Sequence, residues 1–464
     1  MREFFYPSSM AVFGVANKPQ NLAKNIILNC QDMGFKGEIY PVGRRAGKVY
    51  GKEILTNPES LPEDIDLAVI LIPADFVADA LEVCGRKGIL HAIISTAGFR
   101  ELNDQDNQAE RDVQAVAKRY GIRFIGPNCI GVICTGSGLC TPFNPLESKR
   151  FMNGPVSIIL QSGGVTTQSA YHFSDEHLGF SKIISVGNKL NIDELDLLEY
   201  LIEDEETEQI HLYLESIENG RELIRIAERS KKPIVVFKAN VSHTASRIAE
   251  SHTAALSNND RIVDGALRQA GIVRVHDIHD MTVCTKALRL PPLKGDRLVA
   301  LSLSGGFSVI LGDACEKNGF RCPTLPRELI NQIETQRRGG VIRMSNPMDF
   351  GDVYDIKTFR FAIESCMALS DIDGLVLSLA YEPEMKLDIG DGFFIAEQFL
   401  EFFEKICERL NKPIALSFFA ERQYIEELKK ENTFPVFNNA EESVRALRML
   451  RDYWRWRSNI AISE

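Results

Sequence analysis

The chain has 464 residues, which is too long for one hydrophobic core and predicts about three domains. Its 44% hydrophobic and 25% charged residues are typical of a globular protein in water, and the net charge of -11 argues against a general nucleic-acid-binding protein. It contains neither an apolar run of about 18 residues nor a signal-peptide pattern, so we expect no membrane contact and a cytoplasmic location.

The first part of the chain alternates short apolar runs with amphipathic stretches, which predicts a parallel sheet covered by helices. The order of these elements is typical of a Rossmann-like unit, which we place at residues 1–140. The predicted helices are 21–33 and 76–87, and the predicted strands are 10–15, 38–42, 67–72, 91–95 and 123–125.

The details of this unit argue against nicotinamide dinucleotide binding. The first turn, which contains Gly14, Asn17 and Lys18, lacks the Gly-x-Gly-x-x-Gly spacing that brings backbone close to a pyrophosphate. After the second strand, where such a site needs an acid, the chain has Arg44 and Arg45. These arginines suit a phosphorylated ribose or a pyrophosphate, although two arginines after a strand are also compatible with ordinary surface charge.

Three further loops follow predicted strands of this unit. They contain Ile72 and Pro73, Ala97 and Gly98, and Asn128. In an open parallel sheet all such loops lie along the carboxyl edge, where ligands bind. We therefore expect these residues to line a ligand site.

A second sheet follows a linker at 136–149, with strands at 155–160, 182–186, 209–214 and 233–237. Ser162, Gly163 and Gly164 connect its first strand to a predicted helix. Unpaired N–H groups and the positive end of the helix dipole would meet there, which favours a phosphate. Glycines also serve plain tight turns, so the turn alone is weak evidence.

The stretch 238–256 contains almost only small and polar residues, which predicts a surface loop. It carries His243 and His252, and an exposed imidazole on such a loop can act as a nucleophile that moves between two sites. Glu215 ends a neighbouring strand, where its carboxylate would orient an imidazole. A surface ion pair with a lysine is the alternative role for Glu215, and both stay open at this point.

A third sheet, with strands at 297–302, 374–379 and 413–418, repeats the Ser-Gly-Gly turn at Ser304. This repeat suggests two similar doubly wound domains in tandem. The predicted fold is therefore α/β, with a Rossmann-like domain followed by two flavodoxin-like domains at 150–290 and 295–464. The ten cysteines form no Cys-x-x-Cys pair, so we expect reduced thiols and no metal site.

Several motifs together resemble the NDP-forming acyl-CoA synthetase family, and in particular the alpha subunits of ADP-forming acetate-CoA ligases. They begin at Gly126 (Gly-Pro-Asn-Cys-Ile-Gly), at Ser185 (Ser-Val-Gly-Asn-Lys), at Leu212 (Leu-Tyr-Leu-Glu) and at Ser251 (Ser-His-Thr-Ala-Ala-Leu). The resemblance covers nearly the whole chain. It implies a reaction of a carboxylic acid, coenzyme A and ATP through an acyl phosphate and a phosphorylated histidine.

The resemblance also implies roles for individual residues. His252, and not His243, matches the phosphorylated histidine, and Glu215 matches the acid that holds it. The turn from Ser162 to Gly164 matches the phosphate-binding helix start, and the strand-end loops of the first domain match the CoA pocket. Ala254 stands where the family pattern has Gly, a departure that bears on the movement of the loop.

The sequence contains neither an ATP-grasp domain nor a Gly-x-x-x-x-Gly-Lys-Ser/Thr loop. We therefore expect a separate ATP-grasp beta subunit that brings ATP or ADP and Mg²⁺, in a hetero-oligomer. Two alternatives from other classes are a catalytically silent CoA-binding regulatory protein and a nicotinamide-dependent dehydrogenase. The missing fingerprint and the two arginines argue against the second.

Overall fold

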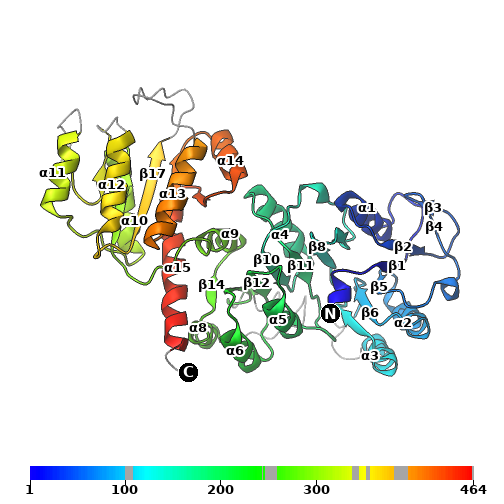
Figure 1. The fold of residues 1–464 in the computed structure, drawn as a ribbon. Helices are drawn as coiled ribbons and strands as arrows, with labels where there is room; N and C mark the ends of the chain where they lie inside the picture. The colour runs from blue at the N-terminus through cyan, green and yellow to red at the C-terminus, as the bar shows by residue number, and fades with distance from the viewer. Residues whose placement is uncertain are drawn as a thin grey trace. The chain divides into compact units, whose positions relative to one another are not determined.

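Three sheets covered by helices, two of them parallel and one parallel except for a hairpin at its edge, organise the described chain (Figure 1). The structure is a computed structural model that describes residues 1–99, 108–242, 244–245, 259–336, 344–351, 356–380 and 396–461. These residues form two units, Met1–Ile278 with the first two sheets and His279–Glu464 with the third. Within the described ranges, no helix is long and apolar enough to cross a membrane.

The first sheet has the strand order β2-β1-β5-β6-β7, and all neighbouring strands are parallel. Its strands are β1 (Ser9–Phe13), β2 (Glu38–Val42), β5 (Leu67–Ile70), β6 (His91–Ile94) and β7 (Arg123–Ile125). Its helices are α1 (Ala23–Met33), α2 (Val77–Arg86) and α3 (Gln108–Tyr120), with 3-10 turns η1 (Arg2–Phe4), η2 (Pro58–Ser60) and η3 (Ala74–Phe76) and a small hairpin of β3 (Lys48–Val49) and β4 (Lys52–Glu53). Helices α2 and α3 pack against each other, α2 also contacts the central strand β5, and all four residues of β5 are buried.

The second sheet has the order β14-β13-β12-β10-β11-β8-β9. Its strands are β8 (Val132–Cys134), β9 (Leu139–Cys140), β10 (Val156–Leu160), β11 (Lys182–Ser185), β12 (Gln209–Leu214), β13 (Ile234–Lys238) and β14 (Val273–Val275). Its helices are α4 (Gly163–Asp175), α5 (Glu194–Glu203), α6 (Gly220–Arg229) and α8 (Asp260–Gln269), and the 3-10 turn η4 (Ser148–Arg150) precedes β10.

The hairpin of β8 and β9 extends the second sheet, because β8 pairs antiparallel with β11. Sequence reasoning did not predict either strand, and β9 lies inside the stretch 136–149 that was expected to be a linker. Two-residue and three-residue strands carry too little pattern to be read from sequence. The connection between the two sheets is therefore itself part of the second sheet.

The third sheet has the order β16-β15-β17-β18-β19. Its strands are β15 (Leu298–Ser302), β16 (Met348–Asp349), β17 (Gly374–Ala380), β18 (Ile414–Phe419) and β19 (Val436–Phe437). The helices of this unit are α9 (Ile278–Ala287), α10 (Gly305–Lys317), α11 (Arg327–Gln336), α12 (Ile356–Ala368), α13 (Ala396–Leu410), α14 (Arg422–Glu431) and α15 (Ala440–Ala461). Helices α10 and α15 pack together against the sheet, and α11 to α14 pack each on the next.

The parallel strands of all three sheets follow one order. When the parallel strands of each sheet are numbered along the chain, all three sheets read 2-1-3-4-5. This is the flavodoxin-like doubly wound order, whose ligands bind at the carboxyl edge between strands 1 and 3, where the order reverses. The predicted fold class is confirmed, and the switch points lie between β1 and β5, β10 and β12, and β15 and β17.

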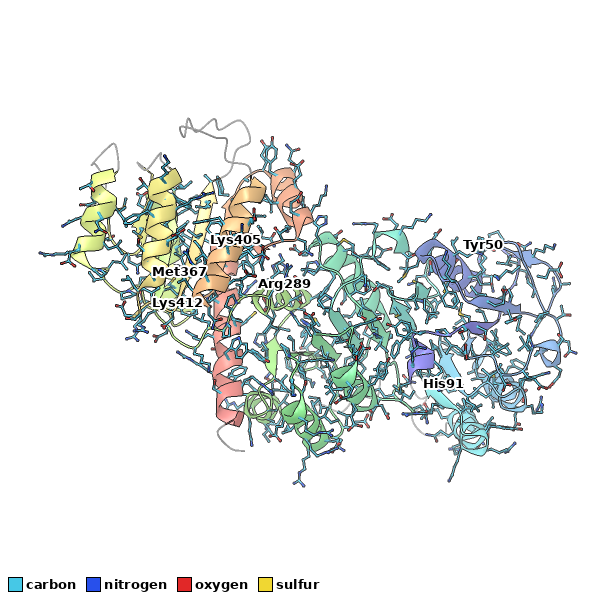
Figure 2. The ribbon with its side chains drawn as sticks, in the orientation of Figure 1. Tyr50, His91, Arg289, Met367, Lys405 and Lys412 are labelled. Carbon is cyan, nitrogen blue, oxygen red and sulfur yellow. The ribbon has the colours of Figure 1, made fainter. Side chains whose placement is uncertain are left out.

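The half-buried Lys412 lies at the C-terminal end of helix α12, beside Met367 (Figure 2). The Lys412 ammonium donates to the carbonyl groups of Met367 (2.8 Å) and Leu369 (2.7 Å) at the end of α12. A lysine at this end also complements the helix dipole. All ten cysteines are free thiols, and only Cys322 is not buried.

Candidate functional site

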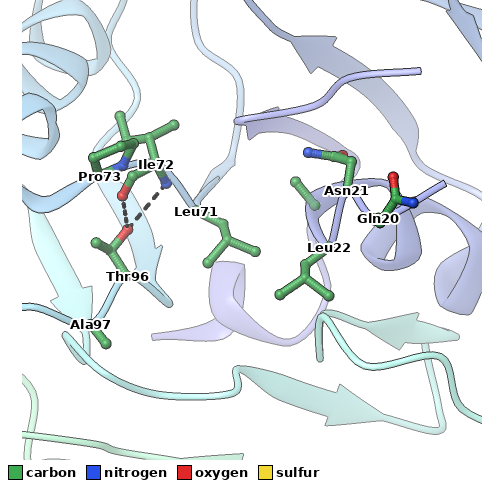
Figure 3. Close-up of a pocket in the computed structure, with 9 residues that line it drawn as sticks. Gln20, Asn21, Leu22, Leu71, Ile72, Pro73, Thr96 and Ala97 are labelled. Atoms are coloured by element: carbon green, nitrogen blue, oxygen red, sulfur yellow. Dashed lines mark hydrogen bonds between the residues drawn. The ribbon is translucent and has the colours of Figure 1, made fainter. Parts of the chain in front are cut away.

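The first pocket lies at the carboxyl edge of the first sheet, at the switch point between β1 and β5. It has a volume of about 340 Å³ and is lined by Gln20, Asn21, Leu22, Ala23, Leu71, Ile72, Pro73, Thr96 and Ala97 (Figure 3). The Thr96 hydroxyl donates to the carbonyl of Ile72 (2.8 Å) and accepts from its N–H (3.2 Å). These bonds tie the loop after β5 to the loop after β6.

The turn after β1 depends on Gly14 and Asn21. Gly14 has a φ of 96°, and a Cβ atom there would lie 2.0 Å from the carbonyl oxygen of Leu71, so only glycine fits. The Asn21 amide donates to the Gly14 carbonyl (2.8 Å), and its oxygen accepts from the N–H groups of Ala16 and Lys24 (3.1 Å each). Sequence reasoning missed Asn21, although an asparagine just before a helix is a usual capping signal.

Six of the ten predicted CoA-site residues line neither of the two pockets described here: Gly14, Asn17, Lys18, Arg44, Arg45 and Gly98. Asn17 and Lys18 are exposed on the turn after β1, and Gly98 is half-buried after β6 with a φ of 105°. They nevertheless lie on the same edge of the sheet as the first pocket, because each follows a strand of that sheet.

Arg44 and Arg45 are both exposed after β2. The Arg44 guanidinium lies 4.9 Å from the centre of the Phe76 ring, a cation–π distance. Phe76 is 45% exposed and belongs to η3, the turn that follows Pro73. Arg44 is therefore held beside the loop that lines the first pocket, through an aromatic contact that sequence reasoning did not find.

The second pocket lies at the carboxyl edges of the first and second sheets, inside Met1–Ile278. It has a volume of about 300 Å³ and is lined by Ser95, Ala97, Asn128, Cys129, Ile130, Phe143, Asn144, Gln161, Ser162, Gly163, Gly164 and Glu215. Ala97 lines both pockets, so the two pockets adjoin there. Asn128, the Ser162 turn and Glu215, all singled out from the sequence, thus lie in one pocket.

Asn128 joins the loops of the two sheets. Its backbone adopts a φ of 56°, and its N–H donates to the carbonyl of Thr96 (2.9 Å). Its side-chain amide donates to the side-chain oxygen of Asn188, which follows β11 (3.2 Å). Asparagine tolerates this left-handed backbone better than most residues.

Ser162 caps helix α4 at the end of β10. Its hydroxyl accepts from the N–H of Val165 (3.5 Å), and its carbonyl accepts from the Thr166 hydroxyl (2.7 Å). A Cβ atom on Gly164 would meet nothing within 4 Å, and the first turn contains no acidic residue. The free N–H groups and dipole of this 13-residue helix therefore offer an open place for an anion.

Glu215 follows β12, on the other side of the switch point from Ser162. The side-chain oxygen of Gln161 accepts from the N–H groups of Glu215 (2.9 Å) and Ser216 (3.2 Å). Burial and the neighbouring Glu215 carboxylate raise the pKa of Tyr213 to about 12. Gln161 thus connects the Ser162 turn to Glu215. Sequence reasoning overlooked Gln161, although a polar residue between an apolar strand and the serine was the signal that could have indicated it.

Two lysines with buried side chains contact residues 215 and 216. Lys238, at the end of β13, donates to the carbonyl of Glu215 (2.9 Å), and burial lowers the pKa of Lys238 to about 8. The Lys189 ammonium lies 3.2 Å from Glu194 Oε1 and 3.4 Å from the Ser216 hydroxyl. Residues 215 and 216 are therefore held by Gln161 and by both amines.

The histidines of the loop after β13 lie outside the described residues. Neither His243 nor His252 is described, and the same holds for Ala254. Their roles stay predictions from the sequence.

Comparisons with known proteins place the chain in a family. Residues 8–135 match a CoA-binding domain, and residues 153–288 match the succinyl-CoA ligase-like flavodoxin domain. Subunit alpha of the ADP-forming acetate-CoA ligase I of Pyrococcus furiosus is 30% identical over 465 residues, which cover 99% of this chain and 98% of that relative. The chain belongs to the NDP-forming acyl-CoA synthetase family.

Two further comparisons support this assignment of the synthetase to its family. The ADP-forming acetate-CoA ligase II of Archaeoglobus fulgidus is 30% identical over 465 residues, covering 98% of this chain and 67% of the relative. The structure of the dinucleotide-forming acetyl-coenzyme A synthetase 1 of Ca. Korarchaeum cryptofilum, in complex with phosphate and ADP, matches with a TM-score of 0.85 at 28% identity and covers 100% of this chain and 98% of that one. The predicted family and ligase function are confirmed, over the alternative of a silent CoA-binding protein.

Proposed function

We propose that this synthetase chain is the alpha subunit of an enzyme that forms acyl-CoA, ADP and phosphate reversibly from a carboxylic acid, CoA and ATP. The observation that carries the proposal is the second pocket, where the Ser162 turn and Glu215 lie together next to the CoA-domain pocket. A site of this kind can hold a phosphate, a thioester and an imidazole side by side.

In the direction that consumes acyl-CoA, the first chemical step is attack of a phosphate oxygen on the thioester carbonyl, and CoA leaves as its thiolate. The product is an acyl phosphate. The N–H groups and dipole at Ser162, Gly163 and Gly164 would offset the charge of the phosphate without moving. Little covalent help from the protein is needed, because positioning supplies most of the rate.

In the second step, His252 attacks the phosphorus atom and the carboxylate of the acid leaves. Glu215 would accept a hydrogen bond from the other ring N–H of His252, which would orient the imidazole and stabilise its charge. The hydrogen bonds from Glu215 and Ser216 to Gln161 support this role, since they hold the main chain that bears the carboxylate.

We propose that CoA lies along the carboxyl edge of the first sheet. Its thioester end would reach the second pocket at Ala97, where the two pockets adjoin. The Arg44 guanidinium, held by Phe76, suits a phosphate group of CoA. The proposed CoA residues are Gly14, Asn17, Lys18, Arg44, Arg45, Ile72, Pro73, Ala97, Gly98 and Asn128.

ATP or ADP, with Mg²⁺, would be bound by an ATP-grasp beta subunit that takes the phosphoryl group from His252. The name of the Pyrococcus relative, subunit alpha, supports a partner chain. The Archaeoglobus relative supports the same idea, because about a third of its length lies outside the match to this chain. Co-expression with the candidate beta chain followed by size-exclusion chromatography tests it: we expect co-elution, and separate elution would contradict it.

The proposed reaction is tested with the reconstituted pair of chains. We expect ADP formation from ATP that requires both a carboxylic acid and CoA. Calorimetric titration of CoA onto the same sample serves as the control for folding. Binding of CoA without acid-dependent ADP formation, across a range of acids, would contradict the proposal.

A further inference from the structure

Phe143 is the large apolar side chain of the second pocket. It follows β9 and is half-buried, and Cys129 and Ile130 add further apolar surface to the lining. The polar groups proposed for phosphate and histidine chemistry, Ser162 and Glu215, line the same pocket. An acid whose carboxyl group reacts at that polar end would direct its tail to the apolar part.

The pocket offers no positive charge to a second carboxylate. Among the described residues that line it, Glu215 is the one charged side chain, and none is a lysine, arginine or histidine. A second carboxylate on the substrate would lose its hydration without an ionic partner. The lining therefore suits an acid with an uncharged tail.

The position of Phe143 is fixed by α1 of the first domain. Asn25 donates to the Phe143 carbonyl (2.9 Å). Asn29, which is 0% exposed, donates to the carbonyls of Pro142 and Asn144 (2.8 Å each) and accepts from the N–H of Leu146 (3.1 Å). Four side-chain hydrogen bonds thus hold four of the five residues 142–146 in place.

We propose that Phe143 determines which acid the enzyme uses, as the wall against which the uncharged tail packs, and that Asn25 and Asn29 are positioning residues for it. This inference rests on the proposed acid-CoA ligase function and specifies its substrate class. A rigid wall excludes longer tails, because the main chain that carries the ring cannot retreat.

The test measures kcat/KM of the reconstituted enzyme with propionate, butyrate, hexanoate and succinate. Phe143→Ala is expected to raise the hexanoate-to-propionate ratio about tenfold, since a methylene in an apolar pocket changes specificity by that order. The KM for CoA is expected to stay unchanged. With the wild type, succinate is expected to fall at least about 100-fold below butyrate, because its second charge stays unpaired.

Two further variants guard against a folding defect. Phe143→Leu retains an apolar side chain and is expected to shift the same ratio in the same direction. Asn25→Ala removes the hydrogen bond to the Phe143 carbonyl while leaving every pocket side chain in place, and is expected to change the ratio about threefold, the lower end of the effects of a lost hydrogen bond. Leu90→Ala, at an exposed leucine that lines neither pocket, is the matched control and should leave the ratio unchanged.

An unchanged ratio in Phe143→Ala and Phe143→Leu, or turnover of succinate equal to that of butyrate, would overturn the inference. Failure of the proposed function gives a different result, because the wild type would then turn over no acid at all. An active wild type whose variants keep its acid preference removes only the role of Phe143.

Discussion

Two Ser-Gly-Gly turns occupy equivalent places in the second and third sheets but have different surroundings. Each follows the first strand of a 2-1-3-4-5 sheet and begins the next helix, α4 or α10. Ser162 caps its helix, whereas Ser304 makes no side-chain capping bond. Gln161 precedes the first serine, and Leu303 precedes the second.

The second turn has a carboxylate directly against it. A Cβ atom on Gly305 would lie 2.8 Å from Asp349 Oδ2, whereas the nearest atom to a Cβ on the equivalent Gly163 would be Ile130 Cβ, at an ordinary contact distance of 3.4 Å. Phe307 packs against Phe419, which is 64% exposed, so this turn borders an apolar surface. The motif therefore predicts a position in the sheet, and the neighbouring side chains decide whether an anion finds room there.

The largest expected effect is a difference in kcat between variants of the two carboxylates near these turns, Glu215 and Asp349. Glu215→Gln should lower kcat for acid-dependent ADP formation about 100-fold or more, because an amide cannot stabilise a charged imidazole. Asp349→Asn, the matched change at the second turn, should leave kcat within about twofold. Equal losses in the two variants would show that the two turns do not differ in the way described.

A smaller loss is expected from the residue before the first serine. Gln161→Leu leaves the N–H groups of Glu215 and Ser216 without their acceptor, and each unpaired group costs about 1–3 kcal/mol. We expect kcat to fall about tenfold, through displacement of Glu215, with KM for CoA unchanged. Gln161→Glu keeps an acceptor oxygen and should recover most of the loss, and Leu303→Ala should have no effect on kcat. A rise in KM for CoA instead of a fall in kcat would count against this role.

The pH dependence of stability tests the buried amine that donates to the Glu215 carbonyl. Burial disfavours the charged form of Lys238. It therefore lowers the pKa of Lys238 from the ordinary value of 10.5 to about 8 in the folded chain. Between these values the unfolded chain binds more protons, so the free energy of unfolding rises with pH. The stability of the wild type relative to Lys238→Met should therefore grow from about pH 8 to pH 10 in urea unfolding. A difference that is flat or that shrinks would contradict the assignment.

The smallest effect concerns the glycines themselves. Gly305→Ala should lower the free energy of unfolding by about 1 kcal/mol, because the Asp349 carboxylate must move. Gly163→Ala, the matched change at the first turn, should cause no such loss, since its Cβ would lie 3.4 Å from the nearest atom, Ile130 Cβ. Thermal unfolding of both variants measures the difference, and equal melting temperatures would indicate that Asp349 yields freely.

Strands that lead into clear turn residues were predictable, whereas most strands of two or three residues were not. The runs at β2, β7 and β12 are apolar and end at clear turn residues, so their predicted limits agree with the structure. Strands β9, β14, β16 and β19 have two or three residues and no readable period, and tertiary pairing decides them.

The site was predictable where a residue ends a strand. Ser162 and Glu215 follow adjacent parallel strands, so their meeting at one edge follows from the order of elements. Gln161 acts through hydrogen bonds to Glu215 and Ser216, and the main chain at Phe143 is held by Asn25, contacts between distant residues that a single sequence does not reveal. The bonds of Asn21 are local. The hydrogen bonds between Asn29 and the loop at 142–146 join residues more than 110 positions apart, so they can be found only in the folded chain.

The most direct test of the central claim is phosphoryl labelling of this chain. It is incubated with acetyl-CoA, Mg²⁺ and radiolabelled phosphate, as wild type and as the His252→Ala, His243→Ala and Glu215→Gln variants. We predict a label that is stable in alkali and lost in acid, present in the wild type and in His243→Ala and absent in His252→Ala. A label that persists in His252→Ala, or no label with any acyl-CoA even after the beta chain is added, would contradict the relay.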